Sequence, residues 1–148
     1  MNNDYRKGIK EMIERLKKKG ITLTPQRLAI IEFLKKSKAH PCVDTIYSEI
    51  KKRYPSISPA TVYSTLQLLV ETGEIQELYI RGDRVCYDPV PQRHHHFLCR
   101  NCGRIFDIKV DCPIINKKMI DGHNVEDVKA YLYGICADCS KKIKKERF

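Results

Sequence analysis

The chain has 148 residues, enough for one domain of ordinary size or two small ones, and it contains no apolar run long enough to cross a membrane. Its 28 Lys and Arg residues against 18 Asp and Glu give a formal net charge of +10, which favours a polyanionic partner such as nucleic acid, although basic chains can also simply be soluble. The charged first nineteen residues lack the apolar core of a signal peptide, so we expect a cytoplasmic protein.

Helical periodicity dominates the first half of the chain. Apolar residues recur at helical spacing in four segments, and Gly20 ends the first of them. Thr24-Pro25 and Ser58-Pro59 each place an N-cap residue before a proline, which is typical of a helix start. The sequence therefore predicts helices over residues 4–19, 25–38, 43–54 and 59–72.

Two short strands, over residues 75–80 and 84–87, are predicted around the turn Arg81-Gly82-Asp83. Helices followed by a β-hairpin are typical of the winged helix-turn-helix, in which the helix before the hairpin enters the DNA major groove. A helical bundle that does not touch DNA is the alternative, and the basic charge favours DNA. The early residues of the 59–72 helix that could reach base edges or phosphates are Ala60, Thr61, Tyr63, Ser64 and Gln67.

The character of the chain changes after residue 88. Two prolines within four residues predict a stiff linker at 89–93. Beyond it we expect strands over 94–99, 104–110 and 125–133, and helices over 113–121 and 136–145. The sequence thus predicts an α+β fold with a winged-helix DNA-binding domain at 1–88 and an α/β domain at 94–148.

Two Cys-x-x-Cys pairs are the strongest motif in the chain. Four thiolates at this spacing suit a tetrahedral zinc ion, and a closed site of this kind stabilises a fold without catalysing a reaction. Metal-free redox pairs are disfavoured because no thioredoxin-like unit surrounds them. The other three cysteines show no pair spacing, and the set does not indicate a disulfide framework in a cytosolic chain. The predicted zinc ligands are Cys99, Cys102, Cys136 and Cys139.

A second group of residues could hold a different metal. On a strand His94 and His96 share one face while His95 points away, so the first two form a two-point ligand. With His40, Asp88 and Asp107 they offer three imidazoles and two carboxylates, which suit Fe(II), Mn(II) or Zn(II) and lean to the harder ions. A polar surface strand is the alternative. Because these residues come from both halves of the chain, a metal held by all five would fix the angle between the halves and could act as a switch.

These motifs together resemble the ferric uptake regulator (Fur) superfamily over nearly the whole chain. The resemblance implies a homodimeric, metal-dependent repressor that binds a double-stranded DNA operator. It makes residues 94–148 the dimerisation and metal-binding domain. We also include Arg27 among the predicted DNA-contacting residues. The matching stretches are Thr24-Pro25-Gln26-Arg27, Ala39-His40-Pro41, Ala60-Thr61-Val62-Tyr63, His94-His95-His96-Phe97-Leu98-Cys99-Arg100-Asn101-Cys102-Gly103 and Tyr133-Gly134-Ile135-Cys136-Ala137-Asp138-Cys139.

Within this superfamily the chain is most similar to the peroxide-responsive (PerR) branch. The regulatory ligands of that branch fall on His40, Asp88, His94, His96 and Asp107, and relatives that control iron or zinc uptake usually carry glutamate at the position of Asp107. The resemblance implies structural Zn(II) and regulatory Fe(II) or Mn(II). It further implies that peroxide oxidises His40 or His94 when iron is bound, after which the protein loses the metal and then the DNA.

Three alternatives remain open at this point. A regulator of iron or zinc uptake would bind its metal reversibly and ignore peroxide. An iron enzyme with a His/His/carboxylate centre would need open coordination positions, which five protein ligands hardly leave. A zinc-ribbon interaction module would bind no specific DNA. We therefore predict a non-enzyme that does not associate with membranes and takes no small molecule beyond metal and peroxide. Ser64 and Gln67 depart from the usual Asn and Arg of related recognition helices, which allows a different operator.

Overall fold

The computed structural model describes residues 3–147 and divides between Pro91 and Gln92 into two compact units. This boundary lies inside the predicted linker at 89–93. DNA binding by the first predicted domain, and dimerisation and metal binding by the second, stay predictions. Residues 1, 2 and 148 of those domains lie outside the described residues. The mixture of helices and short strands confirms the α+β class. No helix within residues 3–147 is both long and apolar enough to span a membrane.

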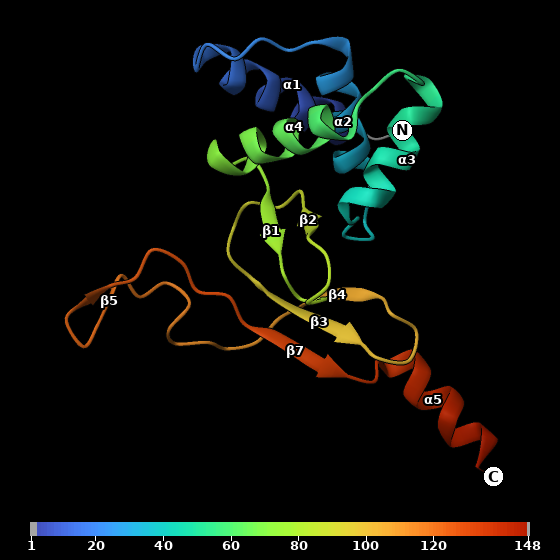
Figure 1. Ribbon diagram of the computed structural model, residues 1–148. Helices are drawn as coiled ribbons and strands as arrows, with labels where there is room; N and C mark the ends of the chain where they lie inside the picture. Colours follow the sequence, from blue (N-terminus) through green and yellow to red (C-terminus); the bar gives the residue numbers. More distant parts are fainter. Residues whose placement is uncertain (1–2, 148) are drawn as a thin grey trace. The chain divides into compact units, whose positions relative to one another are not determined.

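The first unit contains four helices and a two-stranded hairpin (Figure 1). The cap residues act as predicted, because the Thr24 hydroxyl accepts the Arg27 N–H at 3.2 Å and the Ser58 hydroxyl accepts the Thr61 N–H at 3.1 Å. All four predicted helices are confirmed, and both strands are shorter than predicted. The elements are α1 (Asn3–Lys18), α2 (Pro25–Lys36), α3 (Val43–Arg53), α4 (Pro59–Glu71), β1 (Gln76–Leu78) and β2 (Cys86–Asp88).

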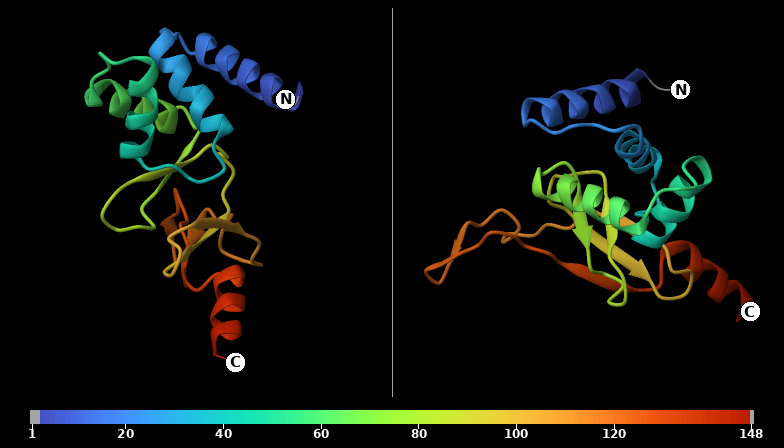
Figure 2. Two further views of the ribbon diagram at one scale, coloured as in Figure 1. Left: turned by 90° about the vertical axis from the view of Figure 1, so that its right-hand side faces the viewer. Right: turned by 45° about the horizontal axis from the view of Figure 1, so that its top comes forward.

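An apolar core holds the four helices of the first unit together. Each helix contributes the face that its periodicity marks, and Tyr87 of β2 closes the core from the hairpin side. Figure 2 shows the four helices gathered around one another, with the hairpin following α4. The core includes Met12, Leu16, Ile30, Ile31, Leu34, Ile46, Ile50, Val62, Leu66, Leu69 and Tyr87.

The second unit is built on a three-stranded sheet that ends in a helix. The central strand β3 (His95–Cys99) pairs antiparallel with β4 (Ile105–Ile108) and parallel with β7 (Tyr131–Gly134). The register places His96 opposite Asp107 and Cys99 opposite Gly134. Helix α5 (Ala137–Glu146) begins immediately after Cys136, its N-cap residue. The sheet thus brings one cysteine pair beside the other.

The predicted helix over 113–121 is wrong. This part of the chain instead forms turns and a small hairpin of β5 (Met119–Ile120) and β6 (His123–Asn124). Asp121 and Gly122 both have positive φ, 50° and 81°, which is the two-residue type I′ turn that Asp-Gly favours. The segment between β4 and β7 extends away from the three-stranded sheet of its own unit (Figure 1).

The predicted strand over 125–133 is also too long, because the observed strand covers only Tyr131–Gly134. The pairing of β7 with β3 begins at Tyr131, opposite His96, although β3 itself begins one residue earlier. Residues 125–130, between β6 and β7, form no strand.

Candidate functional site

The four cysteines of the two Cys-x-x-Cys pairs converge in the second unit. Their sulfur atoms all lie within 4.8 Å of one another, and the Sγ atoms of Cys102 and Cys136 are 3.9 Å apart. A tetrahedral zinc ion with Zn–S bonds of about 2.3 Å separates its sulfurs by about 3.8 Å. Three of the cysteines are buried and Cys102 is exposed. The donor set and its spacing therefore fit a structural zinc ion.

Hydrogen bonds favour the thiolate form of two of these cysteines, Cys99 and Cys102. The backbone N–H groups of Cys102 and Cys136 donate to the Cys99 sulfur at 3.5 and 3.3 Å. Donation from Cys102, joined by that from Cys136, lowers the pKa of Cys99 to about 6. The Arg104 Nε donates to the Cys102 sulfur at 3.4 Å and lowers the pKa of that thiol as well. Gly103, at φ 72°, closes the turn by donating its N–H to the Cys99 carbonyl at 2.8 Å.

A carboxylate and two imidazoles meet elsewhere in the second unit. One oxygen of Asp107 lies 3.0 Å from Nε2 of His94 and 3.3 Å from Nε2 of His96. The opposite position of His96 and Asp107 in the β3–β4 register explains this approach. The other ring nitrogen of His94 lies 2.7 Å from the Gln92 carbonyl, which orients the ring. Three of the five predicted regulatory ligands are thus assembled within one unit.

The other two predicted ligands meet within the first unit. Nε2 of His40 lies 3.3 Å from Oδ2 of Asp88, and both side chains are almost fully buried. The second oxygen of Asp88 accepts the Val90 N–H at 2.8 Å. His40 has φ 51°, in the left-handed region that few residues other than glycine adopt, and such conformations persist where the surroundings hold a functional side chain in place.

The predicted DNA-contacting residues lie at the start of α4 and α2. Ala60, Tyr63, Ser64 and Gln67 are exposed on α4, and Tyr63 is 54% exposed. Thr61 is half-buried because it takes part in the Ser58 cap. Arg27 donates to the Thr22 carbonyl at 2.7 Å, so its guanidinium also orders the loop before α2. These positions agree with a contact surface, and their role on DNA stays a prediction.

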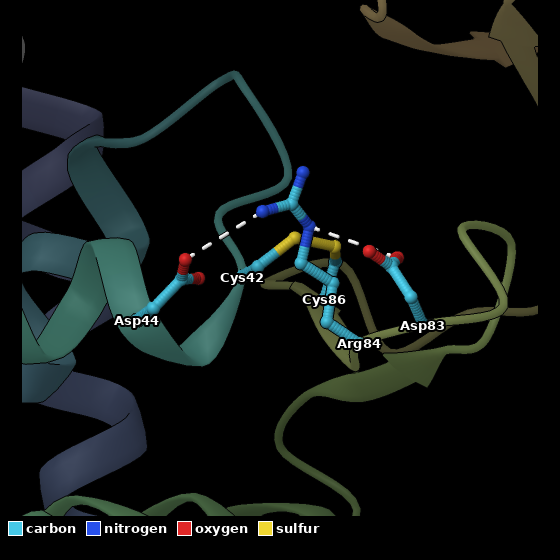
Figure 3. Close-up of a disulfide and its surroundings, with 5 residues drawn as sticks. All are labelled: Cys42, Asp44, Asp83, Arg84 and Cys86. Atoms are coloured by element: carbon cyan, nitrogen blue, oxygen red, sulfur yellow. Dashed lines mark ion pairs between the residues drawn. A yellow bond between two sulfur atoms is a disulfide. The ribbon is translucent and has the colours of Figure 1, made fainter.

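The first unit contains a disulfide that the sequence did not predict. Cys42 and Cys86 are joined in the first unit (Figure 3), although their spacing indicated no pair. The signal was present in the register. Cys42 lies two residues after His40 and Cys86 lies two residues before Asp88, so antiparallel pairing that brings the ligands together also brings the cysteines together. Among the described residues, Cys112 is a free thiol outside both groups.

Residues 18–134 match the ferric uptake regulator family. The peroxide operon regulator of Bacillus subtilis (strain 168) is 37% identical over 139 residues, which cover 90% of this chain and 94% of that protein. PerR from Streptococcus pyogenes, whose structure is described as a basis for peroxide sensing and gene regulation, is 36% identical with a TM-score of 0.54, covering 89% of this chain and 92% of its own. The peroxide stress regulator of Campylobacter jejuni is 35% identical with a TM-score of 0.60, covering 86% and 98%.

The family match spans most of the chain, and the sequence and structural relatives agree with it over nearly their full lengths. This chain therefore belongs to the ferric uptake regulator family.

Proposed function

We propose that this protein is a metal-dependent, DNA-binding transcriptional repressor that senses peroxide. The observation that carries the proposal is the approach of His94 and His96 to one oxygen of Asp107, at 3.0 and 3.3 Å. Relatives that match nearly the whole chain are named for their response to peroxide. An aspartate at this position agrees with that branch of the family.

The regulatory ion would be held by three imidazoles and two carboxylates. The His40–Asp88 pair supplies two of these groups, and His94, His96 and Asp107 supply the others. This donor set suits Fe(II) or Mn(II), and iron, when bound, supplies the electrons that convert peroxide into an oxidant beside its ligands. His40 or His94 would then gain one oxygen atom. An oxidised imidazole is a poorer ligand, so the site would lose its ion.

The DNA-binding form would be a homodimer in the cytosol. Each chain would present the start of α4 to one half of a double-stranded operator, and a two-fold symmetric protein matches a palindromic site. The zinc ion would maintain the fold of the second unit. Oxidation consumes a ligand of the protein itself, so the response is a single event for each molecule and not an enzymatic turnover.

DNA release by peroxide tests this function. An operator is first selected from random duplex DNA with the Mn(II)-loaded protein, and binding is then followed by fluorescence anisotropy. Stoichiometric peroxide should release DNA from the Fe(II)-loaded protein and leave the Mn(II)-loaded complex intact. Retention of DNA by both forms would contradict peroxide sensing and favour a reversible regulator of metal uptake. An absence of specific DNA binding in every metal state would contradict the repressor function itself.

The identity of the acid at residue 107 can be tested separately. Asp107→Glu should preserve metal-dependent DNA binding but slow the release of DNA by peroxide, because the longer side chain moves the carboxylate relative to His94 and His96. Asp111→Glu is the matched control, since Asp111 is an exposed acid four residues away. An unchanged peroxide response in Asp107→Glu would show that this position does not set the response.

A further inference from the structure

The disulfide between Cys42 and Cys86 lies in the same short ladder as the candidate ligands His40 and Asp88. Cys42 is the N-cap residue of α3 and pairs antiparallel with Cys86 of β2. The Tyr87 N–H donates to the Pro41 carbonyl at 2.9 Å, and the Val43 N–H donates to the Val85 carbonyl at 3.3 Å. This register continues by two residues to the His40–Asp88 pair, 3.3 Å apart. Any change at the disulfide therefore acts directly on the segments that carry both ligands.

A small molecule can approach this disulfide from the Cys42 side. A pocket of about 350 Å³ in the first unit is lined by Cys42, His40, Arg81 and Arg84, among other residues, whereas Cys86 does not line it and is fully buried. Figure 3 shows Arg84 between Asp44 and Asp83, with ion pairs of 3.6 and 3.9 Å. The pocket wall carries the guanidinium groups of Arg81 and Arg84 and the carboxylate of Glu49, so it suits a small polar thiol that carries both amino and carboxylate groups.

We propose that Cys42 and Cys86 form a reversible thiol–disulfide site that controls the His40–Asp88 pair. The thiolate of a small thiol attacks the Cys42 sulfur, the bond between Cys42 and Cys86 breaks, and its electron pair leaves on the Cys86 sulfur, which takes up a proton. A second small thiol then attacks the mixed disulfide and releases Cys42 as a thiol, so one protein disulfide is reduced while two small thiols are oxidised to their disulfide. A hydroperoxide reverses the change, because two thiols and one hydroperoxide give the disulfide, water and the corresponding alcohol or water.

The consequence for the ligand pair follows from what remains after reduction. With the disulfide formed, a covalent link holds the His40–Cys42 segment against β2. After reduction, two backbone hydrogen bonds and the Arg84–Asp44 ion pair are among the non-covalent contacts that still join these segments. The His40–Asp88 pair then becomes more mobile. The effect on metal binding rests on the proposed function, in which His40 and Asp88 are ligands. Reduction of the disulfide should then lower the affinity for Mn(II) roughly tenfold, as is typical when the groups that orient a metal ligand are lost.

The redox couple is tested on the full-length, zinc-loaded protein in glutathione buffers of stepped ratio. Samples are quenched with an alkylating reagent and analysed by peptide mass spectrometry. Cys42 and Cys86 should become alkylated together as the buffer becomes more reducing, and any glutathione adduct should lie on Cys42. A disulfide that persists in excess reduced glutathione, or adducts found mainly on Cys86, would overturn the proposal. Cys112→Ser should behave as the wild type.

The coupling to His40 is tested without metal and with it. In protein that retains zinc but carries no Mn(II) or Fe(II), diethyl pyrocarbonate should modify His40 faster after the Cys42–Cys86 disulfide is reduced. Equal rates before and after reduction would overturn the coupling. Mn(II) affinity should fall on reduction in the wild type and should not respond to redox state in Cys42→Ser/Cys86→Ser. Failure of Mn(II) to bind in either state would count against the proposed function, while the histidine modification rates would still decide the coupling.

Discussion

The two units of this protein are stabilised in different ways. The first unit closes an apolar core between four helices, with side chains such as Leu16 and Leu66 fully buried. In the second unit the buried cluster consists of Cys99, Cys136 and Cys139, with Phe97 and Phe106 packed against it. Hydrophobic burial suffices for the first, whereas the second places thiols where a core would otherwise be apolar. We therefore expect the first unit to fold on its own pattern of apolar residues and the second unit to depend on a metal ion at its four cysteines.

Removal of the zinc ligand set should have the largest effect and should separate the two units. Cys102→Ser removes a sulfur that contributes little packing, since Cys102 is exposed. Structural zinc contributes on the order of 10 kcal/mol, comparable with the whole stability of a domain. We expect loss of zinc, loss of the dimer and loss of hydrogen-exchange protection in β3, β4 and β7, with α1–α4 still protected. Cys112→Ser is the control, and a zinc-free variant with a fully protected second unit would contradict this account.

A cavity created by mutation in the first unit should destabilise that unit and leave the second unit unaffected. Leu66 of α4 is completely buried, so Leu66→Ala should cost about 2–5 kcal/mol of the free energy of unfolding. Thermal unfolding should shift the first unit alone, and the zinc content should stay unchanged. Tyr63→Ala on the same helix removes an exposed side chain and should change stability by less than about 0.5 kcal/mol. Zinc loss in Leu66→Ala would show that the units do not fold independently.

A smaller effect is expected at the ion pair that ties α1 to the chain before β1. Arg15 donates from two nitrogens to the carboxylate of Glu74 at 2.9 and 2.8 Å, and the Glu74 side chain is only 5% exposed. Arg15→Ala leaves that acceptor buried without its donors, which costs about 1–3 kcal/mol. Hydrogen exchange should rise mainly in α1. Lys7→Ala breaks an exposed pair with Glu11 and should change little; equal effects of the two variants would contradict the role assigned to burial.

The smallest predicted effect concerns the support of one zinc ligand. Arg104 donates to the Cys102 sulfur and pairs with Asp138 at 3.3 Å. Arg104→Ala should leave the fold intact and speed the transfer of zinc to a chelator roughly tenfold. Arg100→Ala is the matched control, because Arg100 stacks over Tyr133 and does not donate to a described cysteine sulfur. Identical transfer rates in both variants would show that the Arg104 hydrogen bond does not support the site.

The difference between the units also decides how much of the fold could be predicted. Helices α1–α4 followed from apolar spacing and from the caps Thr24 and Ser58, because these signals are local. The 113–121 helix failed because Asp121-Gly122 favours a hairpin, a local signal that should have outweighed Pro113. The extent of β7 could not be predicted, because a strand extends only where β3 offers a partner.

The candidate site shows the same division. The grouping of the four cysteines could be predicted from their Cys-x-x-Cys spacing, because the geometry that a metal ion requires is reflected locally in the sequence. His94, His96 and Asp107 required only the pairing of two neighbouring strands. The Cys42–Cys86 bond could not be predicted without the register between the loop after His40 and β2, because the two cysteines are 44 positions apart in the sequence.

Peptide mass spectrometry after peroxide exposure distinguishes peroxide sensing by histidine oxidation from reversible metal binding. Zinc-loaded protein is supplied with Fe(II) in one sample and Mn(II) in another, and both receive stoichiometric peroxide. We expect a gain of one oxygen atom on the peptide of His40 or His94 in the iron sample alone. No gain on either peptide, with DNA binding still dependent on metal, would contradict peroxide sensing by histidine oxidation and would make this protein a reversible regulator of metal uptake.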